Sequence, residues 1–250
     1  MAIVGSRRPT REGRAFAERL AADLAQRGVV VVSGMAYGID AAAHRGALET
    51  GRTVAVLASG ADLPSPTGNR ALYRAIVERG GAVVSEYPPG MPALAHHFRK
   101  RNRIVSGLAL GTVVVEAGEH SGALVTARHA MDQNREVFAV PGSPLHETTA
   151  GSNALLRDGA ALVRDWLDVV CELAAGCPAL AALARGGTPP ALPQEDAGVR
   201  LARHLGRSPK HVDQLQRECG WSVAELLAEL TELEMRGLAR QHAGSYFSLA

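Results

Sequence analysis

Residues 29–34 read Val29-Val30-Val31-Val32-Ser33-Gly34. Four consecutive valines predict a strand over residues 29–32 that is buried on both faces, which is typical of a parallel sheet covered by helices on both sides. The preceding residues have the four-residue spacing of an amphipathic helix that begins near Thr10, and Gly28 is a suitable residue to end it. Ala2-Ile3-Val4 predicts another strand before that helix. The residues around the valines therefore predict a strand–helix–strand unit.

The same alternation continues along the following residues. A helix is expected after Asp40, ending at Gly51. Short apolar runs predict further strands at Thr53–Leu57, Ala82–Ser85, Thr112–Val115, Glu136–Val140 and Ala161–Val163. Helical patterns separate most of these strands, and strands that alternate with helices make right-handed crossovers to parallel neighbours. We expect an α/β fold with a doubly wound, mostly parallel sheet.

The composition is that of a globular protein. The chain of 250 residues is long enough for one large and one small domain, and 46% hydrophobic residues are ample for a core. No apolar run approaches the length of a membrane span and no signal peptide precedes the first strand, so we expect no membrane partner and a cytoplasmic location. Cys171, Cys177 and Cys219 have no C-x-x-C spacing, which favours reduced thiols over a disulfide or a zinc site.

The expected strands run into small or polar residues at their carboxyl ends, where open parallel sheets bind ligands. Small residues allow a ligand to approach the backbone, and the following helix offers free N–H groups. Asp40 is the expected N-cap of the helix after the second loop. Turn geometry would explain any one of these loops, but together they predict a phosphate-binding edge. The three loops are Gly5-Ser6-Arg7, then Ser33-Gly34-Met35-Ala36-Tyr37-Gly38-Ile39-Asp40, and Ser121-Gly122-Ala123-Leu124-Val125-Thr126.

A concentrated group of cations lies in Phe98-Arg99-Lys100-Arg101-Asn102-Arg103-Ile104. The formal net charge of the whole chain is only +2, so these cations are not a sample of a generally basic surface. We expect Lys100, Arg101 and Arg103 to neutralise phosphates of a nucleic acid, together with Arg7 of the first loop. The alternative interpretation is a solvated helix start, which is common for basic runs.

Two further residues of this segment each have two interpretations. Phe98 is either a platform on which a base stacks or an apolar anchor of the basic helix. Asn102 either bonds a base or caps a turn, and we favour the structural role for it. Aromatic residues make up only 4% of the chain, so stacking cannot be spread over many rings.

Several motifs of nucleotide enzymes are absent from the sequence. It has no G-x-G-x-x-G after the first strand, no G-x-x-x-x-G-K-[ST] and no G-x-S-x-G. The histidines are scattered without the spacing of metal ligands. We therefore expect no cofactor and no metal, and no convincing acid/base pair or nucleophile supports catalysis.

Taken together, the motifs of residues 1–170 resemble the DNA processing protein A family (DprA, also called Smf). The combination is highly specific. It consists of Gly5-Ser6-Arg7-Arg8-Pro9, Ser33-Gly34-x-Ala36-x-Gly38-Ile39-Asp40-x-x-Ala43-His44, Ser85-Glu86-Tyr87-Pro88-Pro89-Gly90, His97-Phe98-x-x-Arg101-Asn102-Arg103-Ile104, Val115-Glu116-Ala117, Ser121-Gly122-Ala123-Leu124-x-Thr126-Ala127 and Val137-Phe138-Ala139-Val140-Pro141-Gly142.

The resemblance implies a Rossmann-like domain that binds and protects single-stranded DNA. No long recognition helix or base-reading fork is apparent in the sequence, so we expect this binding to be independent of the DNA sequence. It also implies a homodimer and a recombinase of the RecA type as partner, which is loaded onto incoming single strands during natural transformation. The residues expected to bind the nucleic acid are Gly5, Ser6, Arg7, Gly34, Gly38, Phe98, Lys100, Arg101, Asn102, Arg103, Ser121, Gly122 and Thr126.

The chain departs from the family pattern in three places. Arg99 stands where the family commonly has Pro, and Tyr37 stands where it often has Arg. One cation is lost and another gained nearby, which keeps the charge but changes the expected track of phosphates. Many relatives carry a helical domain before the first strand, whereas Met1 lies almost on that strand here, as expected for a truncated or a naturally short chain.

The composition changes after residue 174, which we expect to end the first domain. Ala, Gly and Pro dominate residues 175–197 and predict a linker. Residues 198–250 predict a small winged-helix-like domain. Its expected elements are a helix at Val199–Leu205, a second starting at Ser208-Pro209, a third after the capping box Ser222-Val223-Ala224-Glu225, and a hairpin of Leu238–Arg240 with Tyr246–Leu249.

The third helix of this domain has the wrong charge for a DNA-reading helix. It carries Glu225, Glu229, Glu232 and Glu234 against Arg236 alone. Because acidic side chains repel phosphates, we expect a protein-interaction or regulatory role for the domain, such as a dimer contact.

A second class of function is an enzyme that acts on a nucleotide. Nucleoside-monophosphate phosphoribohydrolases have a related fold, with a glycine-rich loop and an acid near the same strand edge. Their P-G-G-x-G-T-x-x-E motif is absent, and Glu116-Ala117-Gly118-Glu119 stands where it would be sought. An enzyme for a small molecule has little use for the cations of residues 99–103, so the DNA-binding interpretation is favoured and the protein is not expected to be an enzyme.

Overall fold

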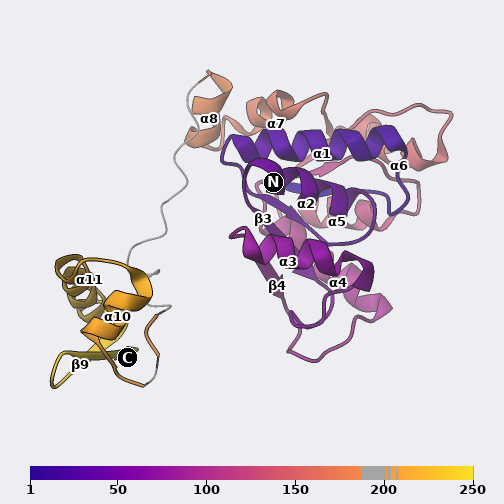
Figure 1. The fold of residues 1–250 in the computed structure, drawn as a ribbon. Coiled ribbons are helices and arrows are strands. Elements are labelled where there is room, and N and C mark those ends of the chain that lie inside the picture. Colours follow the sequence, from indigo (N-terminus) through magenta and orange to yellow (C-terminus); the bar gives the residue numbers. More distant parts are fainter. Residues whose placement is uncertain (187–200, 202–203, 207, 250) are drawn as a thin grey trace. The chain divides into compact units, whose positions relative to one another are not determined.

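The structure is a computed structural model that describes residues 1–186, 201, 204–206 and 208–249. Residue contacts divide the chain into two units, Met1–Pro190 and Ala191–Ala250 (Figure 1). Within the described ranges, no helix has both the length and the apolar character needed to cross a membrane.

In the described part of the first unit, seven strands form one parallel sheet. Their order is β4-β3-β2-β1-β5-β6-β7. The chain therefore builds the sheet outward from β1 to β4, then returns to the other side of β1 and continues outward from β5 to β7. The predicted doubly wound α/β fold is confirmed. The strands are β1 Ala2–Val4, β2 Val31–Ser33, β3 Thr53–Leu57, β4 Ala82–Ser85, β5 Gly111–Val114, β6 Glu136–Ala139 and β7 Ala161–Leu162.

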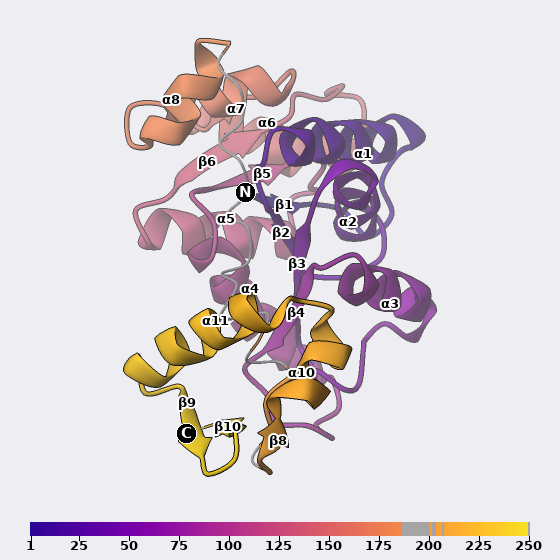
Figure 2. The same cartoon turned by 60° about the vertical axis from the view of Figure 1, so that its left-hand side comes forward.

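Helices cover both faces of this sheet, as right-handed crossovers in two directions require. Ile3 of β1 packs in a cluster with residues of α1 and α2, while Ala2 and Val4 pack with α4 and α5 on the opposite face. Figure 2 shows α1, α2 and α3 together on one side of the strands. The helices between the strands are α1 Arg11–Gln26, α2 Ile39–Thr50, α3 Arg70–Glu78, α4 Ala95–Gly107, α5 Gly122–Asp132 and α6 Ala150–Arg157, with short 3-10 helices η1 Thr67–Asn69 and η2 Glu147–Thr149.

The ends of α1 are as predicted, but β2 begins later than the valine run. Thr10 caps α1 and accepts a hydrogen bond from the Gly13 amide at 3.0 Å. At the other end Gly28 has φ +77°, and the Val29 amide donates to the Leu24 carbonyl at 3.0 Å. Val29 thus satisfies a free carbonyl of the helix end instead of pairing in the sheet. The strand predicted from Val29 accordingly begins at Val31.

The start of α2 corrects the prediction for Asp40. The N-cap is Gly38, with φ +81°, and Asp40 lies inside the first turn of the helix. The Asp40 carboxylate accepts a hydrogen bond from the Ala36 amide at 3.3 Å, so it stabilises the loop before the helix. A Cβ at position 38 would collide with the Ser6 carbonyl, which is why glycine takes the cap position.

Part of the predicted linker is folded. After β7 the chain forms α7 Trp166–Leu173 and α8 Pro178–Ala184. Leu180 and Leu183 of α8 are buried in the cluster that contains α1. Residues 178–184 therefore belong to the first unit, whereas residues 187–197 of the predicted linker lie outside the described residues.

The second unit has the elements expected of a winged helix. Its described elements are β8 Lys210–His211, α10 Val212–Cys219, α11 Val223–Met235, β9 Ala239–His242 and β10 Tyr246–Leu249. The strands pair antiparallel in the order β8-β10-β9, and the predicted hairpin is β9 with β10. The predicted capping box is confirmed, because Ser222 and Glu225 bond each other's backbone amides.

The start of the second helix differs from the prediction. Residues Ser208 and Pro209 precede β8, and α10 begins at Val212 with His211 as its N-cap. The His211 imidazole accepts a hydrogen bond from the Asp213 amide at 3.2 Å, a capping contact that the Ser-Pro pair does not indicate. The helix predicted over residues 199–205 lies mostly outside the described residues.

Candidate nucleic-acid interface

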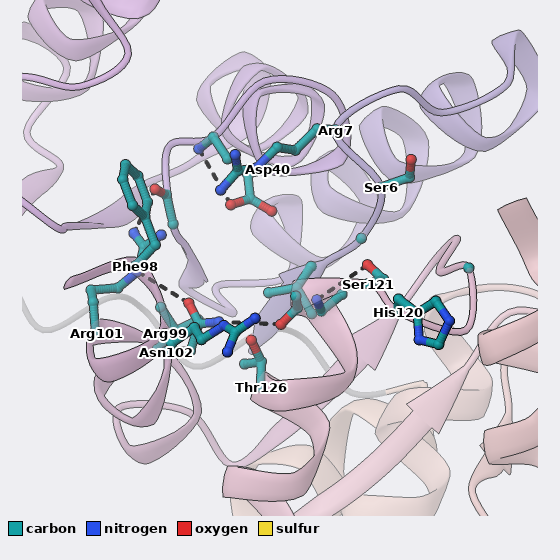
Figure 3. A pocket seen from close by; sticks show the side chains of 18 of the residues that line it. Ser6, Arg7, Asp40, Phe98, Arg99, Arg101, Asn102, His120, Ser121 and Thr126 are labelled. Carbon is teal, nitrogen blue, oxygen red and sulfur yellow. Dashed lines mark hydrogen bonds between the residues drawn. The ribbon is translucent and has the colours of Figure 1, made fainter. Parts of the chain in front are cut away.

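A cavity of about 600 Å³ lies at the carboxyl ends of the central strands. It is lined by the loops that follow β1, β2 and β5 and by one face of α4. After β1 the chain crosses to β2 on one side of the pair β1 and β5, and after β5 it crosses to β6 on the other side. Open α/β sheets bind ligands at such a switch in strand order. Figure 3 shows Arg7 and Asp40 on one side of the cavity, Phe98, Arg99 and Asn102 on a second, and His120 and Ser121 on a third.

The structure brings together ten of the residues proposed from the sequence. Three others, Gly38, Lys100 and Arg103, do not line the cavity. Those that line it are Gly5, Ser6, Arg7, Gly34, Phe98, Arg101, Asn102, Ser121, Gly122 and Thr126.

Backbone hydrogen bonds fix the loop after β1 to neighbouring segments. The Arg7 side chain takes no part in these bonds and is exposed. The Ser6 amide donates to the Glu116 carbonyl at 2.6 Å, and the Ser6 carbonyl accepts from the Ile39 amide at 3.1 Å. Gly5 is tightly enclosed, since a Cβ there would lie 2.7 Å from Ile39 Cγ1. The rigid loop presents the Arg7 guanidinium at the mouth of the cavity, 5.3 Å from the centre of the Phe98 ring.

The cations of the predicted basic run point in different directions because the run is folded as part of helix α4. Phe98, Arg99 and Asn102 have the three- and four-residue spacing of one helix face, and all three line the cavity. Lys100 is exposed beside that face. Arg103 pairs with Glu86, away from the cavity lining. The four cations of this segment therefore do not form one continuous strip facing the same ligand.

Arg101 points inward and is buried, with an exposed fraction of 4%. Its Nη1 donates to the Gly34 carbonyl at 2.5 Å and also to the Val56 carbonyl. Burial raises the pKa of the Asp40 carboxyl, and the positive charge of Arg101 opposes that rise. The Arg101 guanidinium thus has hydrogen-bond acceptors inside the protein although it also lines the cavity, and its contact with phosphates stays a prediction.

The third loop forms the start of α5. The Ser121 hydroxyl caps this helix by accepting from the Ala123 amide at 3.2 Å. The Asn102 Nδ2 donates to the Gly122 carbonyl at 3.2 Å and so ties α4 to the same turn. This bond favours the structural role of Asn102. The amino end of α5 faces the cavity, where its dipole favours an anion.

Five lining residues with polar or charged side chains were not proposed as binding residues: Asp40, Arg99, His120, Glu147 and Thr148. The helical spacing Ala95-Phe98-Arg99-Asn102 was the available signal for Arg99. Glu147 and Thr148 belong to η2, which follows β6 and brings them to the cavity. No residue pattern in the sequence indicates that they lie there. The Thr148 hydroxyl is buried without a hydrogen-bond partner among the described residues.

The cavity has the chemistry of an anion site. Arg7 and Arg99 supply exposed cations, hydroxyl and backbone donors come from the loops, and Phe98 offers an apolar ring face. Over the described ranges, no group of three or more His, Cys, Asp or Glu residues could hold a metal ion.

Comparison with known families settles which family has this arrangement. A model of the DNA recombination-mediator protein A family matches residues 1–174. The chain belongs to this family. A model of the DprA winged helix domain matches residues 186–245, which confirms the winged-helix expectation for the second unit. The resemblance to DprA noted from the motifs is thus confirmed.

Curated DprA relatives are similar over much of their length. Protein Smf of Escherichia coli is 37% identical over 255 aligned positions, covering 100% of this chain and 67% of that protein. The DNA processing protein DprA of Streptococcus pneumoniae is 42% identical over 173 positions, covering 69% of this chain and 61% of that protein. The chain therefore spans about two thirds of the length of these relatives.

Solved DprA structures share the fold of the first unit. DprA from Streptococcus pneumoniae superposes with a TM-score of 0.64 at 42% identity, covering 68% of this chain and 60% of that one. DprA from Helicobacter pylori, described for its single-stranded DNA binding mode, superposes with a TM-score of 0.61 at 30% identity, covering 70% of this chain and 80% of that one. A molybdenum cofactor binding protein from Rippkaea orientalis, 16% identical, shares the fold alone, with a TM-score of 0.50 and coverage of 70% of this chain and 94% of that one.

Proposed function

We propose that the protein binds single-stranded DNA in the cavity at the ends of β1, β2 and β5, without reading its sequence. The observation that carries this proposal is the placement of Arg7 over Phe98 at the cavity mouth, at 5.3 Å. A cation beside a half-buried aromatic ring at the mouth of a cavity is suited to a phosphate and its neighbouring base. The cavity is lined by loops and by one face of α4, which suits contacts with the backbone of a strand, and such contacts carry no sequence information.

The ligand is expected to be a strand and not a free nucleotide. Arg7 and Arg99 are exposed cations on two separate walls, so they suit successive phosphates. The Helicobacter pylori relative is described by its single-stranded DNA binding mode, and its similarity supports the same class of ligand here. The alternative, hydrolysis of a nucleoside monophosphate, lacks an assigned nucleophile or acid/base pair among the lining residues.

In the cell, we propose that the protein acts as a recombination mediator in the cytoplasm. It would protect incoming single strands, load a RecA-type recombinase onto them during natural transformation, and act as a homodimer. The match to the recombination-mediator family over residues 1–174 supports this part of the proposal.

For the winged-helix unit, we propose a contact with protein instead of duplex DNA. The solvent face of α11 carries Glu225 and Glu232 next to exposed apolar side chains, among them Leu227 and Met235. Acidic and apolar groups on the helix that would enter a major groove oppose binding to phosphates. A chain ending at residue 190 should therefore bind single strands as the full chain does. A loss of most of the affinity on removing the unit would contradict this role.

A salt titration of binding tests the central proposal. Fluorescence anisotropy of a labelled oligothymidine is measured with the full chain over a range of salt concentrations, with an unlabelled duplex of equal length as competitor. We expect binding that weakens linearly with the logarithm of salt concentration and that the duplex competes poorly. Absence of binding at low salt, with release of free base from nucleoside monophosphates, would favour the enzyme alternative.

A further inference from the structure

We propose that Arg101 is a positioning residue, which joins the walls of the cavity through a polar relay and does not itself contact DNA phosphates. This inference rests on the proposed function of the cavity, because it assigns roles within that site. The relay runs from the ends of β2 and β3, through Arg101 and Asn102, to the first turn of α5.

The first half of the relay joins α4 to two strand ends. Arg101 Nη1 donates to the carbonyls of Gly34 and Val56, which follow or belong to adjacent strands of the sheet. Gly34 allows this approach, since a Cβ there would lie 2.6 Å from the guanidinium. A planar guanidinium is suited to bridging two such acceptors, and an ammonium group in its place would not keep the same geometry.

The second half of the relay joins α4 to α5. Arg101 Nε donates to Asn102 Oδ1 at 3.3 Å, and Asn102 Nδ2 donates to the Gly122 carbonyl at 3.2 Å. The side-chain amide of Asn102 is therefore held from both sides. Three walls of the cavity are linked: the loop after β2, the helix that carries Phe98 and Arg99, and the turn that begins α5.

The charge of Arg101 interacts with a buried acidic group of the protein. The Asp40 carboxyl is buried on the neighbouring loop and interacts electrostatically with this guanidinium. A phosphate would have to compete with that carboxylate and with two carbonyl acceptors. Arg7 and Arg99 are exposed on the cavity lining whereas Arg101 is buried, so they are the cations better placed to meet the strand.

Single substitutions separate a positioning role from a phosphate contact. Arg101→Lys keeps the positive charge but loses the planar guanidinium that bridges two acceptors. Arg99→Gln removes an exposed charge from the cavity lining. Lys100→Gln is its matched control, because Lys100 is an exposed neighbour outside the lining. Each full-length variant is titrated with oligothymidine at several salt concentrations, at a temperature where thermal unfolding shows it to be folded. We expect R101K to bind about tenfold more weakly, since a hydrogen bond to a charged group is lost, with the salt slope unchanged.

The two controls should behave differently from R101K. R99Q should lower the salt slope by about 0.7, the value for one phosphate contact on a single strand, and K100Q should bind nearly as the unaltered chain does. Unaltered affinity of R101K would overturn the inference and leave Arg101 with a merely structural role. No binding by the unaltered chain would overturn the proposed function itself, and with it this inference.

Arginine modification of the unaltered chain gives a second readout that needs no variant. Phenylglyoxal is added to the protein with and without oligothymidine, and the modified arginines are identified by mass spectrometry. We expect Arg7 and Arg99 to react and to be protected by the strand, and Arg101 to stay unmodified in both samples. Reaction of Arg101 that oligothymidine prevents would overturn the inference, because it would place the guanidinium at the DNA.

Discussion

The guanidinium of Arg7 lies over the ring of Phe98, 5.3 Å from its centre, although the two residues belong to motifs that are far apart in the sequence. Arg7 belongs to the loop after β1, and Phe98 belongs to α4, which follows β4. A cation within about 6 Å of a ring face is attracted by the ring's negative face. The pair joins the two segments at the cavity mouth and places a positive charge beside an aromatic surface.

Replacing Arg7 with Ala should weaken binding of oligothymidine and reduce the salt slope by about 0.7, because one phosphate contact is lost. The thermal midpoint should change little, since Arg7 is exposed and loses only its contact with the Phe98 ring. Arg8→Ala is the matched control, as Arg8 is an exposed neighbour outside the cavity lining. Equal effects of R7A and R8A in anisotropy titrations would show that only the general charge of the loop matters.

Replacing Phe98 with Leu should weaken binding by about 1–3 kcal/mol, the range found for loss of one base-stacking aromatic side chain. The salt slope should stay the same, because no charge is removed. Phe16→Leu is a suitable control, since Phe16 is a partly buried aromatic residue on α1, outside this cavity. A fall in thermal stability of F98L with unaltered DNA affinity would instead support the role of a helix anchor.

Arg99 and Lys100 form a natural pair for a third comparison. They are adjacent and exposed, but only Arg99 lines the cavity. Arg99→Ala should reduce affinity and salt slope together, whereas Lys100→Ala should change both only slightly. The reverse order of effects in the same titration would place the DNA on another face of α4.

Residue patterns in this chain predict the sheet and its binding edge, but not the direction in which each cation points. Valine-rich strands and their small terminal residues indicate the sheet and the binding edge, because burial on both faces and close approach to backbone are local requirements. The orientation of individual cations is different. Arg101 turns inward because the carbonyls of Gly34 and Val56 accept its hydrogen bonds there and Asp40 interacts with its charge. These three residues come from other elements, so a local pattern does not reveal them.

Helical spacing would have improved one part of the site prediction. Phe98, Arg99 and Asn102 share one face of α4, so a helical interpretation of the basic run separates Arg99 from Lys100. No pattern indicates Thr148, since it reaches the cavity through the loop after β6. Similarly, the valine run overstates β2, because the Val29 amide is used to end α1.

The buried His44 should make stability depend on pH. Its Nδ1 lies 2.7 Å from Thr53 Oγ1, and that hydroxyl donates to the Val31 carbonyl, so the neutral imidazole donates to Thr53. Burial, with a smaller effect from Arg101, lowers the pKa of His44 to about 3 from an ordinary 6.5. Below pH 6.5 the unfolded chain takes up a proton that the folded chain does not, so stability is complete above this pH and falls as the pH falls.

Urea unfolding of the unaltered chain and of His44→Asn measures this contribution. Between about pH 7.5 and about pH 5, the unaltered chain should lose about 2 kcal/mol more unfolding free energy than H44N, at roughly 1.4 kcal/mol for each unit of pKa difference traversed. Asn is chosen because its amide can donate to Thr53 and does not titrate. Identical pH profiles for the two proteins would show that His44 is protonated in the folded chain.

The most direct measurement of the central claim is photocrosslinking of the full chain to an oligothymidine that carries 5-iodouracil, followed by mapping of the adducts by mass spectrometry. We predict adducts on the cavity lining, with Phe98 as the main site, and their loss when unlabelled oligothymidine competes. Adducts confined to residues outside the lining, such as those of α11 or the exposed faces of α1 and α3, would contradict the account.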